Sequence, residues 1–194
     1  MKIGLFGGTF DPVHVGHLII AETVSSDFLL DRVFFIPAAV PPHKNGNRIS
    51  PSDRRFEMLT LAIEDHTRFE ISDVEIRRGG LSYTVDTIRW FQESATWRET
   101  AFYLIIGSDS LYDIKNWKHP EKILSSIQVL VIERPGFERK KIGEIYSEYV
   151  QWVSVPEMQI SSTEIRRRVR EEKSIRYWVP RKVEVYIHDK GMYL

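Results

Sequence analysis

Short apolar runs alternate with amphipathic helical patterns along the chain. The runs are rich in Val, Ile and Phe, most are bounded by turn residues, and they predict strands over residues 3–6, 33–36, 69–76, 102–106, 129–132 and 152–155. The helical patterns predict helices over residues 16–30, 51–63, 82–93, 120–126, 138–148, 161–171 and 180–187. Because buried strands that alternate with helices form a parallel sheet covered on both faces, we expect an α/β, doubly wound, mostly parallel sheet.

The segments after the predicted strands are candidate binding loops, because ligands of such sheets bind beyond the carboxyl ends of the strands. Serines mark two helix starts: Ser50 fits an N-cap followed by Pro51 as the first helical residue, and Ser82 fits another N-cap. No internal repeat, low-complexity segment or linker interrupts the pattern, so we expect residues 1–194 to form a single domain.

The segment between the first strand and the first helix carries the densest candidate chemistry. Residues 7–17 read GGTFDPVHVGH. The two glycines allow a phosphate to approach backbone amides, and His14 and His17, three residues apart, share a face if the helix has already begun. Imidazoles and amides that converge on one point suit a transferring phosphoryl group, whose negative charge is spread over its oxygens.

Plainer roles and other chemistries also fit parts of this segment. The glycines fit a tight turn, and either histidine fits a cap or a packing residue. A zinc site on His14 and His17 lacks an obvious third ligand, and the chain has no cysteine. The Walker lysine and the G-x-G-x-x-G spacing are missing, which argues against a P-loop kinase and a dinucleotide-binding dehydrogenase. Phosphate binding is therefore the favoured interpretation.

A second anion-binding pattern opens the helix predicted at residues 161–171. Ser161 and Glu164 have the spacing of a capping box. Ser162 and Arg166 lie four residues apart on one helical face. A hydroxyl, first-turn amides and a guanidinium on one face form an anion site, because arginine offers phosphate a planar fork of donors.

Composition narrows the classes of partner. Lys plus Arg and Asp plus Glu number 27 each, whereas proteins that bind nucleic acid through its phosphates usually carry a basic excess, so we expect no nucleic-acid partner. The lack of cysteine excludes disulfides and cysteine nucleophiles. No apolar stretch is long enough to span a bilayer and no signal-peptide pattern opens the chain, so we expect a cytoplasmic protein with no membrane partner.

Taken together, the motifs resemble one enzyme family. The H-x-G-H core at residues 14–17 is similar to the nucleotidyltransferase signature, and the longer form over residues 7–17 resembles bacterial nicotinate-nucleotide adenylyltransferases. The resemblance implies a Rossmann-like nucleotidyltransferase fold with a short helical C-terminal region. It also implies that ATP, carrying Mg²⁺, reacts with nicotinate mononucleotide to give deamido-NAD and pyrophosphate.

The resemblance assigns roles to residues beside both substrates. The expected catalytic residues are His14, His17 and Arg166. The expected ATP-binding residues are Gly8, Thr9, Phe10, His14, His17, Gly107, Asp109, Ser162, Thr163 and Arg166. The expected mononucleotide-binding residues are Lys44, Tyr83, Thr84 and Trp117, with Trp117 stacked on the pyridine ring. The resemblance predicts no protein ligand for a metal.

Several of these assignments have plainer alternatives. Asp109 fits a helix N-cap, Trp117 a core residue and Lys44 a solvated lysine. The helix start near Ser82 favours a carboxylate over a neutral carboxamide, which selects nicotinate over nicotinamide mononucleotide as the acceptor. An adenylyltransferase for nicotinamide mononucleotide, one of dual specificity, and a non-catalytic nucleotide sensor stay open as alternatives, as does a homo-oligomer.

Overall fold

The fold is an open parallel sheet. The computed structural model describes residues 1–42, 49–133, 146 and 148–194. Within these residues six strands pair in the order β3-β2-β1-β4-β5-β6, and every pairing is parallel. The strands are β1 (Lys2–Gly8), β2 (Arg32–Pro37), β3 (Phe69–Ile71), β4 (Ala101–Gly107), β5 (Gln128–Ile132) and β6 (Val150–Val153). The predicted doubly wound α/β class is thus confirmed.

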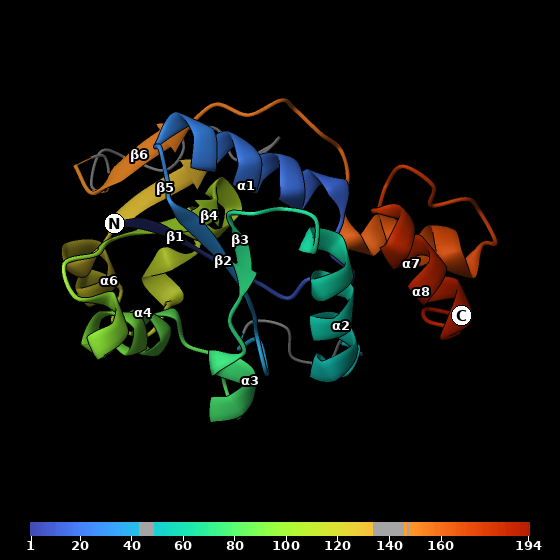
Figure 1. Cartoon of the computed structure of the whole chain (residues 1–194), viewed down its shortest axis with the longest axis horizontal. Helices are drawn as coiled ribbons and strands as arrows, with labels where there is room; N and C mark the ends of the chain where they lie inside the picture. The colour runs from blue at the N-terminus through green and yellow to red at the C-terminus, as the bar shows by residue number, and fades with distance from the viewer. Residues whose placement is uncertain (43–48, 134–145, 147) are drawn as a thin grey trace.

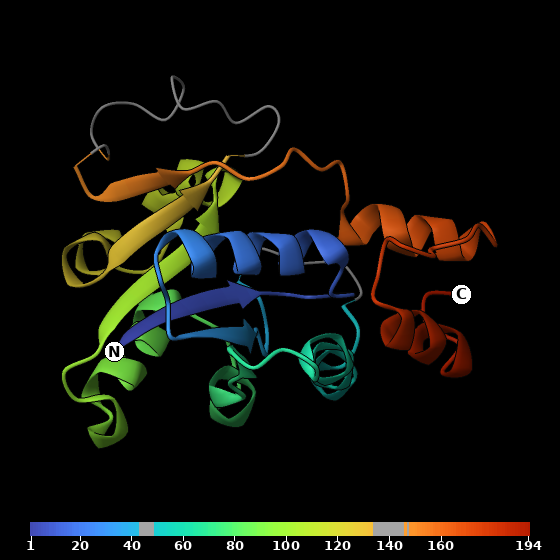
Figure 2. The ribbon, with the colours of Figure 1, turned by 45° about the horizontal axis from the view of Figure 1, so that its top comes forward.

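Helices cover both faces of the sheet and extend beyond one end of it (Figures 1 and 2). They are α1 (Val15–Asp27), α2 (Ser52–Ile63), α3 (Val74–Arg78), α4 (Thr84–Glu93), α5 (Ser108–Tyr112), α6 (Pro120–Ser126), α7 (Ser162–Arg170) and α8 (Arg181–Asp189). Two short 3₁₀ turns are η1 (Ala95–Trp97) and η2 (Ile114–Asn116). The predicted helical C-terminal region corresponds to α7 and α8. None of the helices in the described parts of the chain has the length and apolar character for a membrane crossing.

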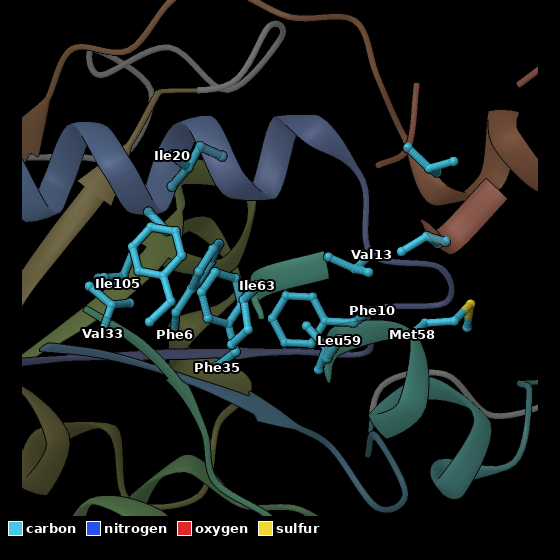
Figure 3. Packing of buried hydrophobic residues seen from close by; sticks show 14 of the residues in the cluster. Phe6, Phe10, Val13, Ile20, Val33, Phe35, Met58, Leu59, Ile63 and Ile105 are labelled. Atoms are coloured by element: carbon cyan, nitrogen blue, oxygen red, sulfur yellow. The ribbon is translucent and has the colours of Figure 1, made fainter. Parts of the chain in front are cut away.

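Alternating strand residues divide the core between the two faces. Phe6 and Phe35 point into a cluster under α1 and α2, which Figure 3 shows together with Phe10 and Met58. Leu5 and its neighbours on the other face pack against α4, α5 and α6. Each fully buried side chain of this kind stabilises the fold by about 1.5–3 kcal/mol. These two layers hold the carboxyl ends of β1 and β4 rigidly side by side.

Three local predictions were wrong at element boundaries. The strand predicted over residues 69–76 ends at Ile71 and is followed by α3, because apolar residues in so short a run fit either structure. Pro51 is the N-cap of α2 rather than its first residue. Tyr83, not Ser82, is the N-cap of α4.

Tertiary partners explain the two displaced helix starts. The amide of Ser50 donates to Asp11 Oδ2 at 3.1 Å, and its carbonyl accepts from Arg55 Nε at 2.9 Å. The hydroxyl of Ser82 accepts from the amide of Ala39 at 2.9 Å. The Ser82 hydroxyl thus holds another segment instead of capping α4, and the backbone of Ser50 joins Asp11 to the first turn of α2. The helix predicted over residues 138–148 falls mostly outside the described residues.

Candidate active site

A cavity of about 1370 Å³ opens at the carboxyl ends of β1 and β4. These neighbouring strands are where the strand order reverses, which is the usual ligand position in such sheets. The predicted site residues that line it are Gly8, Thr9, Phe10, His14, His17, Tyr83, Thr84, Gly107, Asp109, Trp117, Ser162, Thr163 and Arg166. Lys44 lies outside the described residues. The structure therefore brings together every predicted site residue that it describes.

The two histidines form a stacked pair at the start of α1. Their ring centroids lie 3.7 Å apart with an interplanar angle of 25°. His14 is the N-cap residue and is 7% exposed, and its amide donates to Nδ1 of His17 at 3.2 Å. Because Nδ1 of His17 accepts this bond, a neutral His17 ring carries its proton on Nε2. The pair therefore places a ring N–H donor at the positive end of a helix dipole.

The glycines and the phenylalanine of the motif shape the space around these rings. A Cβ on Gly8 would lie 2.8 Å from the Phe10 ring, and a Cβ on Gly16 would lie 3.0 Å from Nδ1 of His14. Phe10 has a φ of 51°, in the left-handed region, and its buried ring packs edge-on to His17 at 5.0 Å. Phe10, predicted to bind ATP, thus lines the cavity and packs its ring against His17.

The start of α7 is fastened to the first loop. The hydroxyl of Ser162 donates to the carbonyl of Pro12 at 2.9 Å, and Nη1 of Arg166 donates to the carbonyl of Asp11 at 2.7 Å. Ser161 caps α7 as predicted, since its Oγ accepts from the amide of Glu164 at 3.2 Å, but the Glu164 carboxylate accepts from Arg167 and does not complete the predicted capping box. These bonds join segments about 150 residues apart, so the amides of the first turn of α7 share one cavity with the two histidines.

Arg166 keeps donors beyond these contacts. Its Nη2 also donates to Thr163 Oγ1 at 3.3 Å. A guanidinium has five N–H donors, and these two bonds use two of them. The orientation of the fork is thus set by the loop and by α7, while further donors are left for an anion.

The loop after β4 forms another wall. Gly107 is the N-cap of α5, and Asp109 lies in its first turn, so the interpretation of Asp109 as the cap itself was wrong. Trp117 follows η2, is half-buried against the α4 to α6 side of the core, and lines the cavity. The carboxylate of Asp109, which can accept hydrogen bonds, and the flat ring of Trp117 therefore line the same cavity.

The N-terminus of α4 also lines the cavity, with Tyr83 as its cap and Thr84 as its first residue. Lys118 was missed by the sequence reasoning. Its Nζ lies 4.6 Å from the centroid of the Tyr83 ring and 2.9 Å from Asp86 Oδ2. Its position directly after Trp117 was the available signal. Because the ammonium group is paired with the Asp86 carboxylate, the first-turn amides of α4 are the groups here that favour a negative charge.

A buried carboxylate was missed as well. Glu75 lines the cavity, is 7% exposed, and accepts from Thr87 Oγ1 at 2.6 Å. Arg78 donates to the same hydroxyl oxygen at 3.0 Å. Sequence reasoning placed Glu75 on a strand, so no signal in the pattern pointed to it. These bonds tie α3 to the first turns of α4.

The site offers phosphate donors rather than a metal cage. Within the described parts of the chain, no group of three or more His, Cys, Asp or Glu side chains is placed to hold a metal ion. The zinc alternative on His14 and His17 therefore finds no third ligand among those residues. The donors present are ring N–H groups, helix-start amides and a guanidinium, which suit a polyphosphate.

Comparisons with known proteins agree with this chemistry. A family model described as cytidylyltransferase-like matches residues 5–168. The chain is 46% identical to a Caldicellulosiruptor saccharolyticus protein named "Probable nicotinate-nucleotide adenylyltransferase", over all of this chain and 99% of the relative. It is 44% identical to a Thermus thermophilus protein of the same name, and all of both chains is covered.

A solved structure has a similar fold. The Plasmodium falciparum nicotinic acid mononucleotide adenylyltransferase complexed with NaAD matches with a TM-score of 0.82 and 22% identity, over 99% of this chain and 97% of that one. This likeness supports the Rossmann-like fold, while the full-length identities carry the family assignment. The chain belongs to the cytidylyltransferase-like nucleotidyltransferases and, within them, to the bacterial nicotinate-nucleotide adenylyltransferases.

Proposed function

We propose that the chain joins ATP and nicotinate mononucleotide in this cavity to give deamido-NAD and pyrophosphate. An oxygen of the mononucleotide 5′-phosphate bonds to the α-phosphorus of ATP, and the bond from that phosphorus to the oxygen bridging to the β-phosphate breaks. The observation that carries the proposal is the attachment of α7 to the first loop, because it gathers both phosphate-binding motifs at one place.

The proposed reaction needs positioning more than it needs a nucleophilic side chain. A phosphate monoester has its second pKa near 6, so the attacking oxygen is already ionised at neutral pH. Holding two bound reactants in line lowers the barrier by removing the loss of motional freedom from the reaction step. The remaining task is to stabilise the charge that develops on the transferred and leaving phosphates.

Three side chains supply that stabilisation in the proposal. Nε2–H of His17 donates to an oxygen of the transferred phosphate, and His14 assists it from the stacked position. Arg166 and the first-turn amides of Ser162 and Thr163 hold the outgoing pyrophosphate. The amides around Gly8 and Thr9 and the wall at Gly107 and Asp109 hold the rest of the ATP.

We propose that Mg²⁺ enters bound to ATP, as is general for nucleotidyltransferases. The ion neutralises part of the triphosphate charge when bound. Mg²⁺ keeps several waters and is held largely by substrate phosphates in such sites, so a dedicated protein cage is not required. The neutral and cationic donors that line the cavity are compatible with a triphosphate that brings its own counter-ion.

The acceptor side of the proposal uses Trp117 and the start of α4. The pyridine ring stacks on Trp117, and the carboxylate of nicotinate accepts from amides at Tyr83 and Thr84. Lys44 is proposed to approach the mononucleotide phosphate. The neutral carboxamide of nicotinamide mononucleotide gains less from this environment.

Pyrophosphate release with the acid and amide mononucleotides side by side tests the proposal. We expect turnover with ATP and nicotinate mononucleotide and much weaker turnover with the amide. Equal rates would support dual specificity and contradict the role of the α4 start. ATP binding without pyrophosphate release with either acceptor would support the nucleotide-sensor alternative and refute the proposed enzyme function.

A further inference from the structure

Arg55 is buried beside the active site without lining the cavity. It lies in the first turn of α2 and is 1% exposed. Its guanidinium donates to four carbonyls: Thr9 at 2.8 Å, Ser50 at 2.9 Å, Ala38 at 2.6 Å and Ala39 at 3.3 Å. A buried arginine satisfied mainly by backbone carbonyls restrains the segments to which those carbonyls belong.

The carbonyls belong to three segments that meet around the cavity. Thr9 is in the loop proposed to hold the ATP phosphates, and Ala38 and Ala39 follow β2. The amide of Ala38 also donates to the carbonyl of Gly8 at 2.9 Å. Arg55 therefore restrains the phosphate loop relative to the strand end beside it.

Further hydrogen bonds connect the end of β2 to the start of α4, where the mononucleotide is proposed to bind. The amide of Ala39 donates to Ser82 Oγ at 2.9 Å, and the amide of Ser82 donates to the carbonyl of Val40 at 3.0 Å. Ser82 directly precedes Tyr83, the cap of α4. A continuous set of hydrogen bonds thus runs from Thr9 through Arg55 to the wall proposed to bind the pyridine carboxylate.

Planar peptides explain how a side chain behind the wall can orient groups in front of it. In a trans peptide the C=O and the following N–H point in opposite directions. The peptide between Ala38 and Ala39 behaves this way, since its carbonyl faces Arg55 while its N–H faces Ser82. By the same geometry, Arg55 sets the direction of the Phe10 N–H through the carbonyl of Thr9.

A buried counter-charge maintains the guanidinium in this place. Asp11 is 3% exposed, accepts from the amide of Ser50 at 3.1 Å, and accepts from the Tyr193 hydroxyl at 2.7 Å. Burial lowers the pKa of Arg55, and the carboxylate of Asp11 opposes that shift. Arginine stays charged in proteins, so Arg55 donates through all its bonds without a proton change.

We propose that Arg55 is a positioning residue for adenylyl transfer, which sets the ATP-phosphate loop and the acceptor wall relative to each other. The inference rests on the proposed function. A positioning role differs from a purely structural role in one measurable respect: a folded variant that lacks the guanidinium has a raised KM for both substrates and a lowered kcat/KM. A change on one wall alone, such as Trp117→Ala, affects mainly the substrate on that side.

The test uses Arg55→Met and Arg55→Lys with Arg54→Met as the matched control. Arg54 is the neighbouring arginine of the same helix, is partly exposed, and donates to the Tyr186 hydroxyl rather than to the cavity loops. Steady-state pyrophosphate release gives kcat and both KM values, circular dichroism and thermal melting give the folded fraction, and calorimetry gives the affinity for ATP. Activity is expressed per folded molecule.

We expect Arg55→Met to lower kcat/KM at least a hundredfold and to raise KM for ATP and for the mononucleotide. Arg55→Lys keeps the charge opposite Asp11, but a single ammonium cannot span the three segments, so we expect at least a tenfold loss. Arg54→Met should stay within twofold of the parent. If the Arg55→Met variant does not fold, the activity of the Arg55→Lys variant alone tests the positioning role.

Three results would overturn the inference: activity per folded molecule within threefold of the parent in Arg55→Lys, a loss confined to one substrate, or a loss fully explained by the unfolded fraction. The parent enzyme tests the proposed function separately. If the parent binds ATP but shows no turnover, the proposed function fails, while the ATP affinities of the Arg55 variants still test the positioning role on the phosphate loop.

Discussion

Replacing Gly16 by alanine should separate catalysis from stability at this site. Gly16 is buried in the first turn of α1, between the two histidines in sequence. A Cβ there would lie 3.0 Å from Nδ1 and 3.2 Å from Cε1 of His14. The first distance is about 0.4 Å short of ordinary contact, which begins at 3.4 Å. The His14 ring, already stacked on His17 at 3.7 Å, must therefore move.

The substitution has two opposing effects on stability. Alanine is favoured over glycine within a helix by about 1 kcal/mol. Crowding a packed ring costs about 1–3 kcal/mol. The free energy of unfolding should therefore change by no more than about 2 kcal/mol. Catalysis is more sensitive, because a displacement of 1 Å at reacting groups costs about a hundredfold, so a shift of a few tenths of an ångström should lower kcat about tenfold.

Steady-state pyrophosphate release and thermal melting measure the two quantities on the same preparation. Ser26→Ala is the control, because Ser26 is exposed near the end of the same helix and far along it from the histidines. It should keep parental kcat. A Gly16→Ala enzyme with parental melting and kcat within twofold of the parent would refute the claim that this glycine positions the His14 ring.

Three further predictions follow from contacts in the site. His17→Ala should weaken transition-state stabilisation by about 3 kcal/mol and so lower kcat. It should also lower the melting temperature, because the ring packs on His14 and Phe10; parental turnover would exclude the proposed role. Trp117→Ala should raise KM for the mononucleotide about tenfold, since stacking contributes about 1–3 kcal/mol. KM for ATP should stay nearly unchanged, and steady-state kinetics in which KM rises for ATP but not for the mononucleotide would contradict the stacking role of Trp117. Burial and the charge of Asp11 raise the pKa of Tyr193 above its usual value of about 10. The unfolded state then loses this proton first, so this group should lower the free energy of unfolding by about 1.4 kcal/mol per pH unit above pH 10. Urea denaturation at pH 9 and pH 11 should show a smaller decrease in Tyr193→Phe, and equal decreases would count against the buried Tyr193–Asp11 bond.

The fold class and the two phosphate-binding motifs were predictable from the sequence. Runs such as residues 102–106 and 129–132 are apolar on both faces, which identifies buried parallel strands without knowledge of their neighbours. The H-x-G-H core and the helix start at Ser161 depend on local geometry: a glycine beside a ring, and a serine that caps its own helix. Such features involve residues within a few positions of one another.

Features set by distant residues could not be predicted in this way. Ser50 and Ser82 look like caps, yet Asp11 and Ala39 engage them from other segments. The run at residues 69–76 divides into β3 and α3, since only packing decides how a short apolar run folds. Nothing in the sequence pattern distinguishes Arg55 and Glu75 from other charged residues, and only the fold buries them and gives them partners.

The sequence by itself determined most of the strands and helices and the chemical groups available at two helix starts, because each depends on periodicity or on neighbours along the chain. Only the tertiary structure decided that these starts meet, through Ser162 and Arg166 on the carbonyls of Pro12 and Asp11. A backbone carbonyl carries no identity in the sequence, so a contact made to it across about 150 residues leaves no pattern to read. The site exists because the folded sheet brings those carbonyls and donors within hydrogen-bonding distance.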